Sequence, residues 1–308
     1  MGPAARVFGV AVTFRPVVPD TAALLRAVAP QVDGLVVVDN GSPADSVAGL
    51  RAACEDVGAE LIESGANLGI AAAQNRGVAR ARALGATDIL LLDQDSLPAP
   101  DMVSRLRGGL ARARAVVPGG AVAAVGPVTR DERQPDAPLL FHDETWGPRR
   151  APLPTNDGEL VPVTFLLASG CLVTGEALDR VGPMNEAWFI DHIDLEWGLR
   201  ATRAGMAQFG VAGAILHHHL GDATRKLPGR ARQVHLHSPV RNYYMARNTL
   251  LLVRSGLMRP AWRLGYAAWI VKYAGFYVLL QPPRRERIRE LAAGLRDGLL
   301  GRTGPRVR

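Results

Sequence analysis

Short apolar runs alternate with longer amphipathic stretches over the first third of the chain. The apolar runs predict buried strands at residues 7–14, 34–39, 60–63 and 87–92. Runs without polar interruption are typical of parallel strands that are covered on both faces. The stretches between them predict helices at residues 21–29, 46–58 and 67–84. This alternation predicts an α/β fold in which a mostly parallel sheet is flanked by helices.

The middle of the chain continues the pattern with one interruption. It predicts further helices at residues 101–117, 175–181 and 191–204, further strands at 122–128 and 210–216, and an apolar segment at 164–174. Residues 129–162 are rich in proline and charge, which predicts a long loop with a short hairpin near 141–146. Long loops inside compact domains are usually functional. We expect these elements to form one domain, large enough to be a catalytic domain, over residues 1–236.

The last 72 residues have a different character. Two long apolar segments, 243–257 and 261–280, precede an arginine-rich tail, so we expect a helical extension over residues 237–308. Aromatic residues recur at steps of three and four in 261–280, with Arg263 and Lys272 among them, which suits a helix lying in a membrane interface. A helix buried against the first domain is the alternative. No charge-free stretch of about 20 residues is present to span a bilayer.

Composition narrows the class of protein without choosing a function. The chain is 48% hydrophobic, which is enough for a substantial core, and its net charge of +7 implies an anionic partner. Nucleic acid, nucleotide-sugar phosphates and anionic lipid all fit that charge. The two cysteines, Cys54 and Cys171, form no disulfide framework, and the N-terminus lacks the apolar segment of a signal peptide. Both features predict a protein of the reducing cytosol.

The strand at 87–92 ends in two carboxylates, Asp93 and Asp95, separated by one residue. The carboxyl ends of parallel strands form the edge at which open α/β sheets bind ligands. Two carboxylates this close repel each other unless a cation lies between them. A hard ion such as Mg²⁺ or Mn²⁺ would accept both and still bind substrate phosphates. The alternative is an ordinary turn with two solvated aspartates.

Polar residues also follow two other elements at this edge. Asp39 ends the second strand, where its carboxylate could bind a ribose hydroxyl or a base N–H, or could form the Asx turn that Asp-Asn-Gly-Ser favours. Asn67 and Gly69 precede a helix, whose N-terminus favours phosphate. Asn67 could equally be the N-cap of that helix. Neither a dinucleotide fingerprint nor a Walker A sequence is present.

Acidic and histidine clusters follow in the second half. Asp191 and Asp194 are three residues apart at an expected helix start, which places both carboxylates on one face, either as a general base or as ordinary capping acids. His217 and His219 follow a strand, and one imidazole could complete a metal site with Asp95. A zinc site built from these histidines with His235 and His237 is the rival, although the phosphate-facing aspartates suit a harder ion.

In this order the segments resemble an inverting family 2 glycosyltransferase of the GT-A fold over residues 7–255. The resemblance is carried by Val10-Ala11-Val12-Thr13-Phe14, Val38-Asp39-Asn40-Gly41-Ser42, Asn67-Leu68-Gly69-Ile70-Ala71, Gln74-Asn75, Asp93-Gln94-Asp95 and Asp191-His192-Ile193-Asp194. The sequences Leu91–Ser96, Phe189–Trp197, His219–Asp222 and Arg241–Tyr244, with Arg247-Asn248, are similar to those of bacterial rhamnosyltransferases. This resemblance implies dTDP-β-L-rhamnose as donor and a lipid-linked polysaccharide as acceptor. It also implies a peripheral position at the cytoplasmic face of the bacterial membrane.

The resemblance also assigns expected roles. It implies that the nucleotide sugar is bound by Thr13, Arg15, Asp39, Asn67, Gly69, Asn75, Asp93 and Arg247, and that Mg²⁺ or Mn²⁺ is held by Asp95, Asp93 and His219. The family commonly has Glu-Asp at the acidic helix start, and this Asp is the base. Here the matching residues are Asp191 and His192, so Asp191 is the first choice of base, Asp194 the second and His192 the third. Arg241 and Arg247 either contact phosphate or pair with the acids.

Three alternatives remain at this point. The same fold could use another donor, such as a UDP-hexose or UDP-galactofuranose. Paired carboxylates also occur in glycoside hydrolases, which need neither metal nor nucleotide. A non-catalytic membrane scaffold is the third alternative. Nucleic acid is not expected as a partner, because the sheet region lacks basic patches interleaved with aromatic residues. The sequence leaves open whether the chain forms a homo-oligomer.

Overall fold

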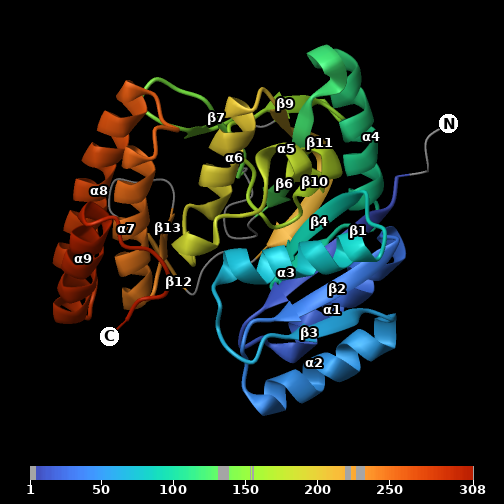
Figure 1. Cartoon of the computed structure of the whole chain (residues 1–308), viewed down its shortest axis with the longest axis horizontal. Helices are drawn as coiled ribbons and strands as arrows, with labels where there is room; N and C mark the ends of the chain where they lie inside the picture. The colour runs from blue at the N-terminus through green and yellow to red at the C-terminus, as the bar shows by residue number, and fades with distance from the viewer. Residues whose placement is uncertain are drawn as a thin grey trace.

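The computed structural model describes residues 5–130, 139–152, 154, 156–218, 223–226 and 233–307. Its centre is a nine-stranded sheet with helices on both faces (Figure 1). The strands are β1 (Val7–Thr13), β2 (Gly34–Asp39), β3 (Glu60–Glu63), β4 (Asp88–Asp93), β5 (Ser96–Pro98), β6 (Val122–Arg130), β9 (Leu160–Pro162), β10 (Leu172–Thr174) and β11 (Ala207–His218). Two small antiparallel pairs lie outside it, β7 (Phe141–His142) with β8 (Arg149–Arg150), and β12 (Ala223–Lys226) with β13 (Gln233–Leu236).

The strand order of the sheet is β3-β2-β1-β4-β10-β6-β11-β5, and β9 also pairs with β11. Strands β3, β2, β1 and β4 are parallel to one another, and β6 and β11 are parallel to each other. Strand β10 is antiparallel to both β4 and β6, so β6 and β11 run in the same direction as β4. The predicted, mostly parallel sheet is therefore confirmed.

Side chains alternate between two hydrophobic cores along each central strand. In β1, Val10 and Val12 enter one core, whereas Ala11 enters the other. In β4, Ile89 and Leu91 join the first core and Leu90 joins the second. Successive side chains of a strand point to opposite faces of the sheet. The uninterrupted apolar runs of the sequence therefore reflect burial on both faces.

Helices cover both faces of the sheet. The α-helices of the described chain are α1 (Val18–Val28), α2 (Ala44–Val57), α3 (Ile70–Ala83), α4 (Met102–Val116), α5 (Gly175–Val181), α6 (Ile193–Arg203), α7 (Pro239–Arg254), α8 (Pro260–Leu280) and α9 (Arg284–Leu299), and the first six of them cover the sheet. Side chains of α3, α5 and α6 share a core with one face, and those of α1, α2 and α4 share a core with the other. Helix α3 approaches the sheet closely at Gly77, where a Cβ atom would lie 2.3 Å from Cγ1 of Val10.

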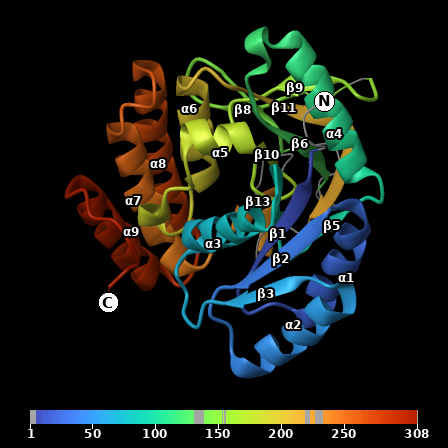
Figure 2. The ribbon, with the colours of Figure 1, turned by 45° about the vertical axis from the view of Figure 1, so that its right-hand side comes forward.

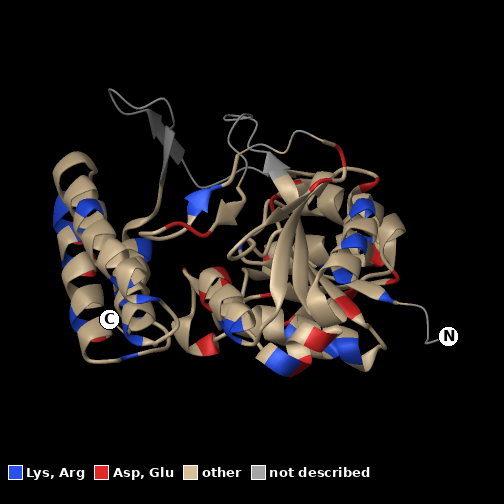
Figure 3. Ribbon diagram, turned by 90° about the horizontal axis from the view of Figure 1, so that it is seen from above, with Lys and Arg blue, Asp and Glu red and all other residues tan. Residues whose placement is uncertain are grey.

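The last three helices gather beside α6, at the opposite end of the molecule from α1 and α2 (Figure 1; Figure 2). Helix α9 packs on α7 at Gly294, where a Cβ atom would lie 2.3 Å from the Tyr243 carbonyl oxygen. Leu252 of α7 belongs to the same core as β1 and β4, so this part of the extension packs on the sheet domain. Blue segments of basic residues recur along the C-terminal helices in Figure 3, and α9 contributes five arginines, Arg284, Arg285, Arg287, Arg289 and Arg296. Among the described residues, none of the helices is long and apolar enough to cross a membrane.

Two details differ from the sequence-based expectation. The expected helix over residues 191–204 begins at Ile193, because Asp191 and His192 have left-handed φ values of 69° and 62° that no α-helix accepts. Strands β5, β9 and β10 have three residues each, and such short segments contain too few positions to show a period of two. The predicted hairpin is present as β7–β8, but it extends to Arg150.

Candidate active site

A cavity of about 1300 Å³ opens beside the carboxyl edge of the sheet. Its lining includes the end of β4, the start of α3, the loop and first turn at residues 190–195, Arg241 of α7, and helix α8. The hairpin β7–β8 and residues 165–168 close the remaining side. Three carboxylates, Asp93, Asp191 and Asp194, face this one cavity. The structure thus brings together the first and second acidic clusters, which are about 100 residues apart in the sequence.

Asp39 forms the Asx turn that was one of its two interpretations. Its Oδ2 accepts hydrogen bonds from the backbone N–H groups of Gly41 (3.1 Å) and Ser42 (2.9 Å). Its Oδ1 lies 3.3 Å from Oγ1 of Thr13, which donates from the end of the neighbouring strand. Asp39 is 1% exposed. In this structure the carboxylate shapes the strand-end loop.

The loop before α3 is organised by a pair of asparagines. Nδ2 of Asn40 donates to Oδ1 of Asn67 (3.2 Å), and Oδ1 of Asn40 accepts from the Leu68 N–H (2.9 Å). Oδ1 of Asn67 also accepts from the Gly69 N–H (3.0 Å), and the helix cap is Gly69 rather than Asn67. The sequence analysis did not single out Asn40, although its position in Asp-Asn-Gly-Ser marked it as a turn residue.

Gly69 is required by the close approach of two loops. Its φ is 88°, and a Cβ atom there would lie 2.6 Å from the carbonyl oxygen of Phe189. The next N–H, that of Ile70, donates to the same oxygen at 2.8 Å. The first helical N–H group is therefore bound to the loop that carries Asp191. Only a glycine allows both contacts.

Gln94, between the two aspartates, ties the β4–β5 turn to β1. Its Oε1 accepts from the Phe14 N–H at 2.8 Å, and its Nε2 donates to the Phe14 carbonyl at 3.3 Å. Arg15, with a φ of 49°, follows this contact, and its N–H donates to Oγ of Ser42 at 2.8 Å. These bonds bring the ends of β1, β2 and β4 together. Arg15 is exposed and lies at this edge.

The residues predicted to bind a metal meet only in part. Asp93 is half-buried in the cavity wall, and Asp95 is exposed in the turn that follows. Strand β11 runs antiparallel to β5 and places His218 opposite Ser96, next in sequence to Asp95. His219 lies outside the described residues, as do the side chains of His218 and His235. Among the residues that the structure describes, no three histidine, cysteine or acidic side chains cluster tightly enough to hold a metal ion.

Two carboxylates nevertheless suit a magnesium-like ion. Mg²⁺ is commonly bound by one or two carboxylates and completes its shell with water and substrate phosphates. The charge of Asp93 is also felt at Asp194, whose pKa it helps to raise, so a cation beside Asp93 would relieve repulsion across the cavity. The donor set fits Mg²⁺ or Mn²⁺ together with a diphosphate. It does not provide a protein-only zinc site within the described chain.

The loop with the second acidic cluster has an unusual backbone. Phe189, Asp191 and His192 all have φ values between 62° and 69°. This region costs free energy for residues other than glycine, so surrounding contacts must hold it. Nδ2 of Asn248 on α7 provides them, since it donates to the carbonyls of Trp188 (3.0 Å), Ile190 (2.7 Å) and Asp191 (3.0 Å). Asn248 is 0% exposed.

Arg247 has a structural position instead of facing the cavity. The whole residue is 0% exposed, and its guanidinium donates to the carbonyls of Trp188 (2.8 Å) and Gly304 (2.5 Å). Asn75 also lies away from the cavity, where Nδ2 donates to the Met184 carbonyl (2.9 Å) and Oδ1 accepts from its N–H (2.9 Å). Neither is among the residues that line the cavity. Both fasten the segment before Asp191.

Asp191 is held by Arg241 of α7. The guanidinium donates Nε to both carboxylate oxygens, at 2.9 Å to Oδ2 and 3.1 Å to Oδ1, and its Nη2 also bonds to Oδ1. The side chain of Asp191 is 3% exposed. Both oxygens of this carboxylate therefore already accept hydrogen bonds from the guanidinium. Of the two roles considered for Arg241, the structure shows pairing with an acid.

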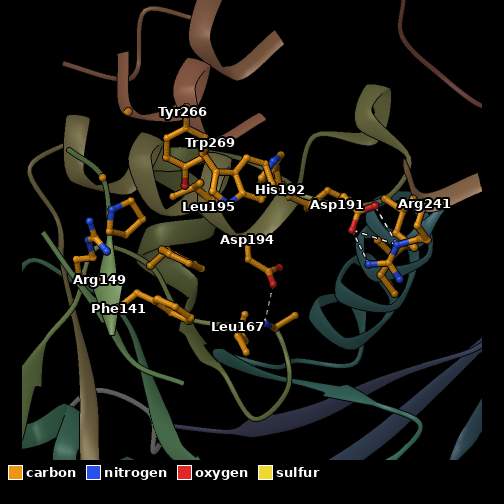
Figure 4. A pocket seen from close by; sticks show the side chains of 18 of the residues that line it. Phe141, Arg149, Leu167, Asp191, His192, Asp194, Leu195, Arg241, Tyr266 and Trp269 are labelled. Atoms are coloured by element: carbon orange, nitrogen blue, oxygen red, sulfur yellow. Dashed lines mark hydrogen bonds and ion pairs between the residues drawn. The ribbon is translucent and has the colours of Figure 1, made fainter. Parts of the chain in front are cut away.

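Asp194, in the first turn of α6, points into the middle of the cavity (Figure 4). The Ala168 N–H donates to its Oδ2 at 3.2 Å. Burial, with smaller contributions from the charges of Asp93 and Asp191, raises the pKa of this carboxyl to about 7. A carboxyl with a pKa near neutrality is suited to accept a proton during a reaction.

His192 lies between the two acids in sequence and packs under α8. Its Nε2 lies 2.9 Å from Oγ1 of Thr249, and its ring makes edge contacts with Tyr266 and Trp269. Burial lowers the pKa of His192 to about 4, so the ring is neutral at pH 7. A neutral imidazole of such low basicity is a poorer base than Asp194.

The fold and the acidic cavity at the carboxyl edge of the sheet are those of a glycosyltransferase of the GT-A type. Residues 15–174 match the family described as glycosyl transferase family 2, and the chain belongs to this family. It is an enzyme of the glycosyltransferase class. This membership favours transfer over the hydrolase and scaffold alternatives.

One characterised relative matches almost the full chain. The dTDP-rhamnosyl transferase RfbF of Shigella flexneri is 27% identical over 301 residues, which cover 97% of each chain. Among solved structures, S. aureus TarS in complex with UDP-GlcNAc has a TM-score of 0.57 and 12% identity, covering 94% of this chain and 80% of that one. A longer TarS chain gives a TM-score of 0.54 at 12% identity, with 94% of this chain covering 49% of that length.

A solved structure of another protein contains a metal ion. The Pyrobaculum calidifontis mannosyltransferase PcManGT in complex with GDP-Man and Mn²⁺ has a TM-score of 0.52 and 16% identity, covering 94% of this chain and 74% of that one. At these identities the structural neighbours establish the fold alone. They confirm the GT-A arrangement that the sequence predicted.

Proposed function

We propose that the protein transfers L-rhamnose from dTDP-β-L-rhamnose, with inversion, to a hydroxyl group of a lipid-linked polysaccharide. The observation that carries the reaction type is the position of Asp194, a carboxyl of raised pKa in the same cavity as Asp93 at the strand ends. The match to a dTDP-rhamnosyl transferase along nearly the whole chain supports rhamnose as the sugar. A UDP-hexose or UDP-galactofuranose is the alternative donor.

The donor lies along the carboxyl edge in this proposal. Thr13, Arg15, Asp39, Asn67 and Gly69 lie in the strand-end loops outside the cavity lining, where the nucleotide would bind, and Asp93 and Asp95 lie where the diphosphate would end. Mg²⁺ or Mn²⁺, held by these aspartates with His219, would supply a Lewis acid that offsets charge on the departing dTDP. Asn75 and Arg247 act on the donor only indirectly, by holding the neighbouring loop.

Asp194 is the base in this mechanism. The acceptor hydroxyl attacks the anomeric carbon from the face opposite the diphosphate, and the new C–O bond forms as the bond to the diphosphate oxygen breaks. The leaving dTDP keeps the electron pair, and the hydroxyl proton goes to the carboxylate of Asp194. The Ala168 N–H orients that carboxylate. Asp191 fixes the loop through Arg241 instead of taking the proton.

The exposed surface of the extension supports a position at an anionic membrane surface. Val271, Leu279 and Leu280 of α8 are 71%, 67% and 49% exposed, and the arginines of α9 follow directly. Apolar side chains beside cations are the usual features of peripheral attachment. In this proposal the enzyme works at the cytoplasmic face, where it meets a lipid-linked acceptor. The division at residue 236 and the oligomeric state stay predictions.

The decisive experiment measures sugar release and transfer by the purified protein. We expect dTDP-rhamnose to be consumed in the presence of Mg²⁺ or Mn²⁺, with at least about tenfold less turnover of UDP-glucose or UDP-galactofuranose, and loss of activity on adding EDTA. Faster turnover of a UDP-sugar would overturn the donor assignment. Full activity in EDTA, with no metal retained by elemental analysis, would overturn the metal role.

A further inference from the structure

We propose that the cavity holds an acceptor-sugar subsite in which a pyranose ring lies between two aromatic walls, Tyr266 and Trp269 of α8 on one side and Phe141 and Phe165 on the other. This inference rests on the proposed function and assigns to these four aromatic side chains the binding of the acceptor carbohydrate. It also gives α8, expected from the sequence at a membrane, a role in the active site.

The first wall is a set of rings along one face of α8. The rings of Tyr266 and Trp269 are 6.1 Å apart, and each lies within about 6 Å of the His192 ring, which fixes the helix above the acidic loop. Trp269 is 38% exposed, and Tyr266 is partly buried. Both residues line the cavity. A large aromatic surface is thus available to a ligand next to the acids.

The opposite wall comes from a different part of the chain. The rings of Phe141 and Phe165 stack with centroids 4.9 Å apart, and Phe141 begins the β7–β8 hairpin. Trp146, at the turn of this hairpin, is 58% exposed and also lines the cavity. Figure 4 shows Asp194 between Tyr266 and Trp269 on one side and Phe141 on the other. The carboxylate therefore lies between the two walls.

This arrangement matches the chemistry of a sugar ring. A pyranose presents flat patches of C–H groups on its two faces and hydroxyl groups around its edge. Aromatic walls can cover the faces, while a carboxylate between them reaches a hydroxyl at the edge. Arg149 and Lys272 line the same cavity and provide donors for further hydroxyls or for an acidic neighbour sugar. The diphosphate of the donor belongs beside Asp93, so the walls are left to the acceptor.

The test uses saturation-transfer NMR with three soluble probes, methyl α-L-rhamnopyranoside, methyl β-D-glucopyranoside and methyl N-acetyl-β-D-glucosaminide. We expect at least one of them to receive saturation at its ring C–H protons in the wild-type protein. Trp269→Ala should lower that signal at least fivefold, and Trp269→Phe should restore most of it. The matched control is Val271→Ala on the same helix, because Val271 is 71% exposed and does not line the cavity.

Two results with the sugar probes alone would overturn the subsite, and a third comes from competition with dTDP. One is no saturation transfer to any of the probes, and the other is an undiminished signal in Trp269→Ala. Displacement of the sugar by dTDP would assign the walls to the donor instead and would also overturn the proposal. Binding of dTDP, measured by calorimetry on each variant, reports separately on folding and on the donor site. A protein that binds the sugar but does not turn over dTDP-rhamnose would retain this subsite and reject the proposed function.

Discussion

The strand-end loops, where we propose that the donor binds, and the acidic loop of the cavity, where we propose that the acceptor binds, are built in different ways. On the donor side, Asp39, Asn40 and Asn67 bond to backbone groups within the loops that end the strands, and the bonded residues are at most 28 apart in sequence. On the acceptor side, Asn248 and Arg241 reach across 50 to 60 residues to hold a loop of left-handed backbone. The bonds of Asp39, Asn40 and Asn67 therefore join residues that are close in sequence, whereas the acidic loop depends on the C-terminal helix α7 to hold its left-handed backbone.

The largest expected effect comes from Asp194→Asn. We expect transfer to fall about 1000-fold, because the amide cannot take the proton. The same change should raise the free energy of unfolding at pH 8 by about 2–4 kcal/mol, since burial of the charged carboxylate destabilises the fold. Kinetics and chemical denaturation measure the two effects.

The stability gained by Asp194→Asn should depend on pH. The pKa of Asp194 is raised in the folded state to about 7, so the folded protein binds the proton more tightly than the unfolded chain. The destabilisation grows as pH rises toward 7, and the gain from Asp194→Asn should be larger at pH 8 than at pH 5. Asp191→Asn should instead destabilise, because Arg241 loses its partner. If Asp194→Asn keeps wild-type turnover, Asp194 is not the base.

A smaller but broad effect is expected for Asn248→Ala. Three carbonyl oxygens lose their common donor, so we expect the free energy of unfolding to fall by about 2–4 kcal/mol and transfer to fall about 10- to 100-fold. Asn242→Ala is the matched control, because Asn242 is equally buried on α7 but bonds to Tyr273 and Arg287.

We expect the control to lose stability while it keeps its turnover at a temperature where it stays folded. Thermal unfolding and steady-state kinetics at that temperature separate the two effects. Equal losses of turnover in both variants would mean that the acceptor loop does not depend on Asn248 in particular.

The smallest of the three effects is expected on the donor side. Asp39→Ala leaves the Gly41 and Ser42 N–H groups without their acceptor, and we expect dTDP to bind about tenfold more weakly in calorimetry. Asp33→Ala is its control, because Oδ2 of Asp33 accepts from the Val7 N–H at the other end of β1. Weaker dTDP binding in the Asp33 variant, or unchanged binding in the Asp39 variant, would contradict a local donor site.

Much of the donor side could be predicted because its signals are local. Asp39 and Asp93 each end an apolar strand of the parallel sheet. This local pattern is enough to place both carboxylates at the ligand-binding edge of the sheet. The alternation of strands and helices predicted the sheet for the same reason. Gln94 shows the limit, since its bonds to Phe14 join residues 80 apart that no local pattern connects.

The acceptor side was predicted in its residues but not in its arrangement. The sequence alone pointed to Asp191 and Asp194 as acids and to an aromatic helix after residue 260. Only the tertiary structure shows that Arg241 forms an ion pair with Asp191 and that Asp194 faces the cavity. It also places Tyr266 and Trp269 opposite Phe141. Hydrophobic periodicity indicates which positions of a segment are buried. The ion pair of Arg241 and the positions of the aromatic side chains around the cavity depend instead on contacts between segments that are distant in the sequence.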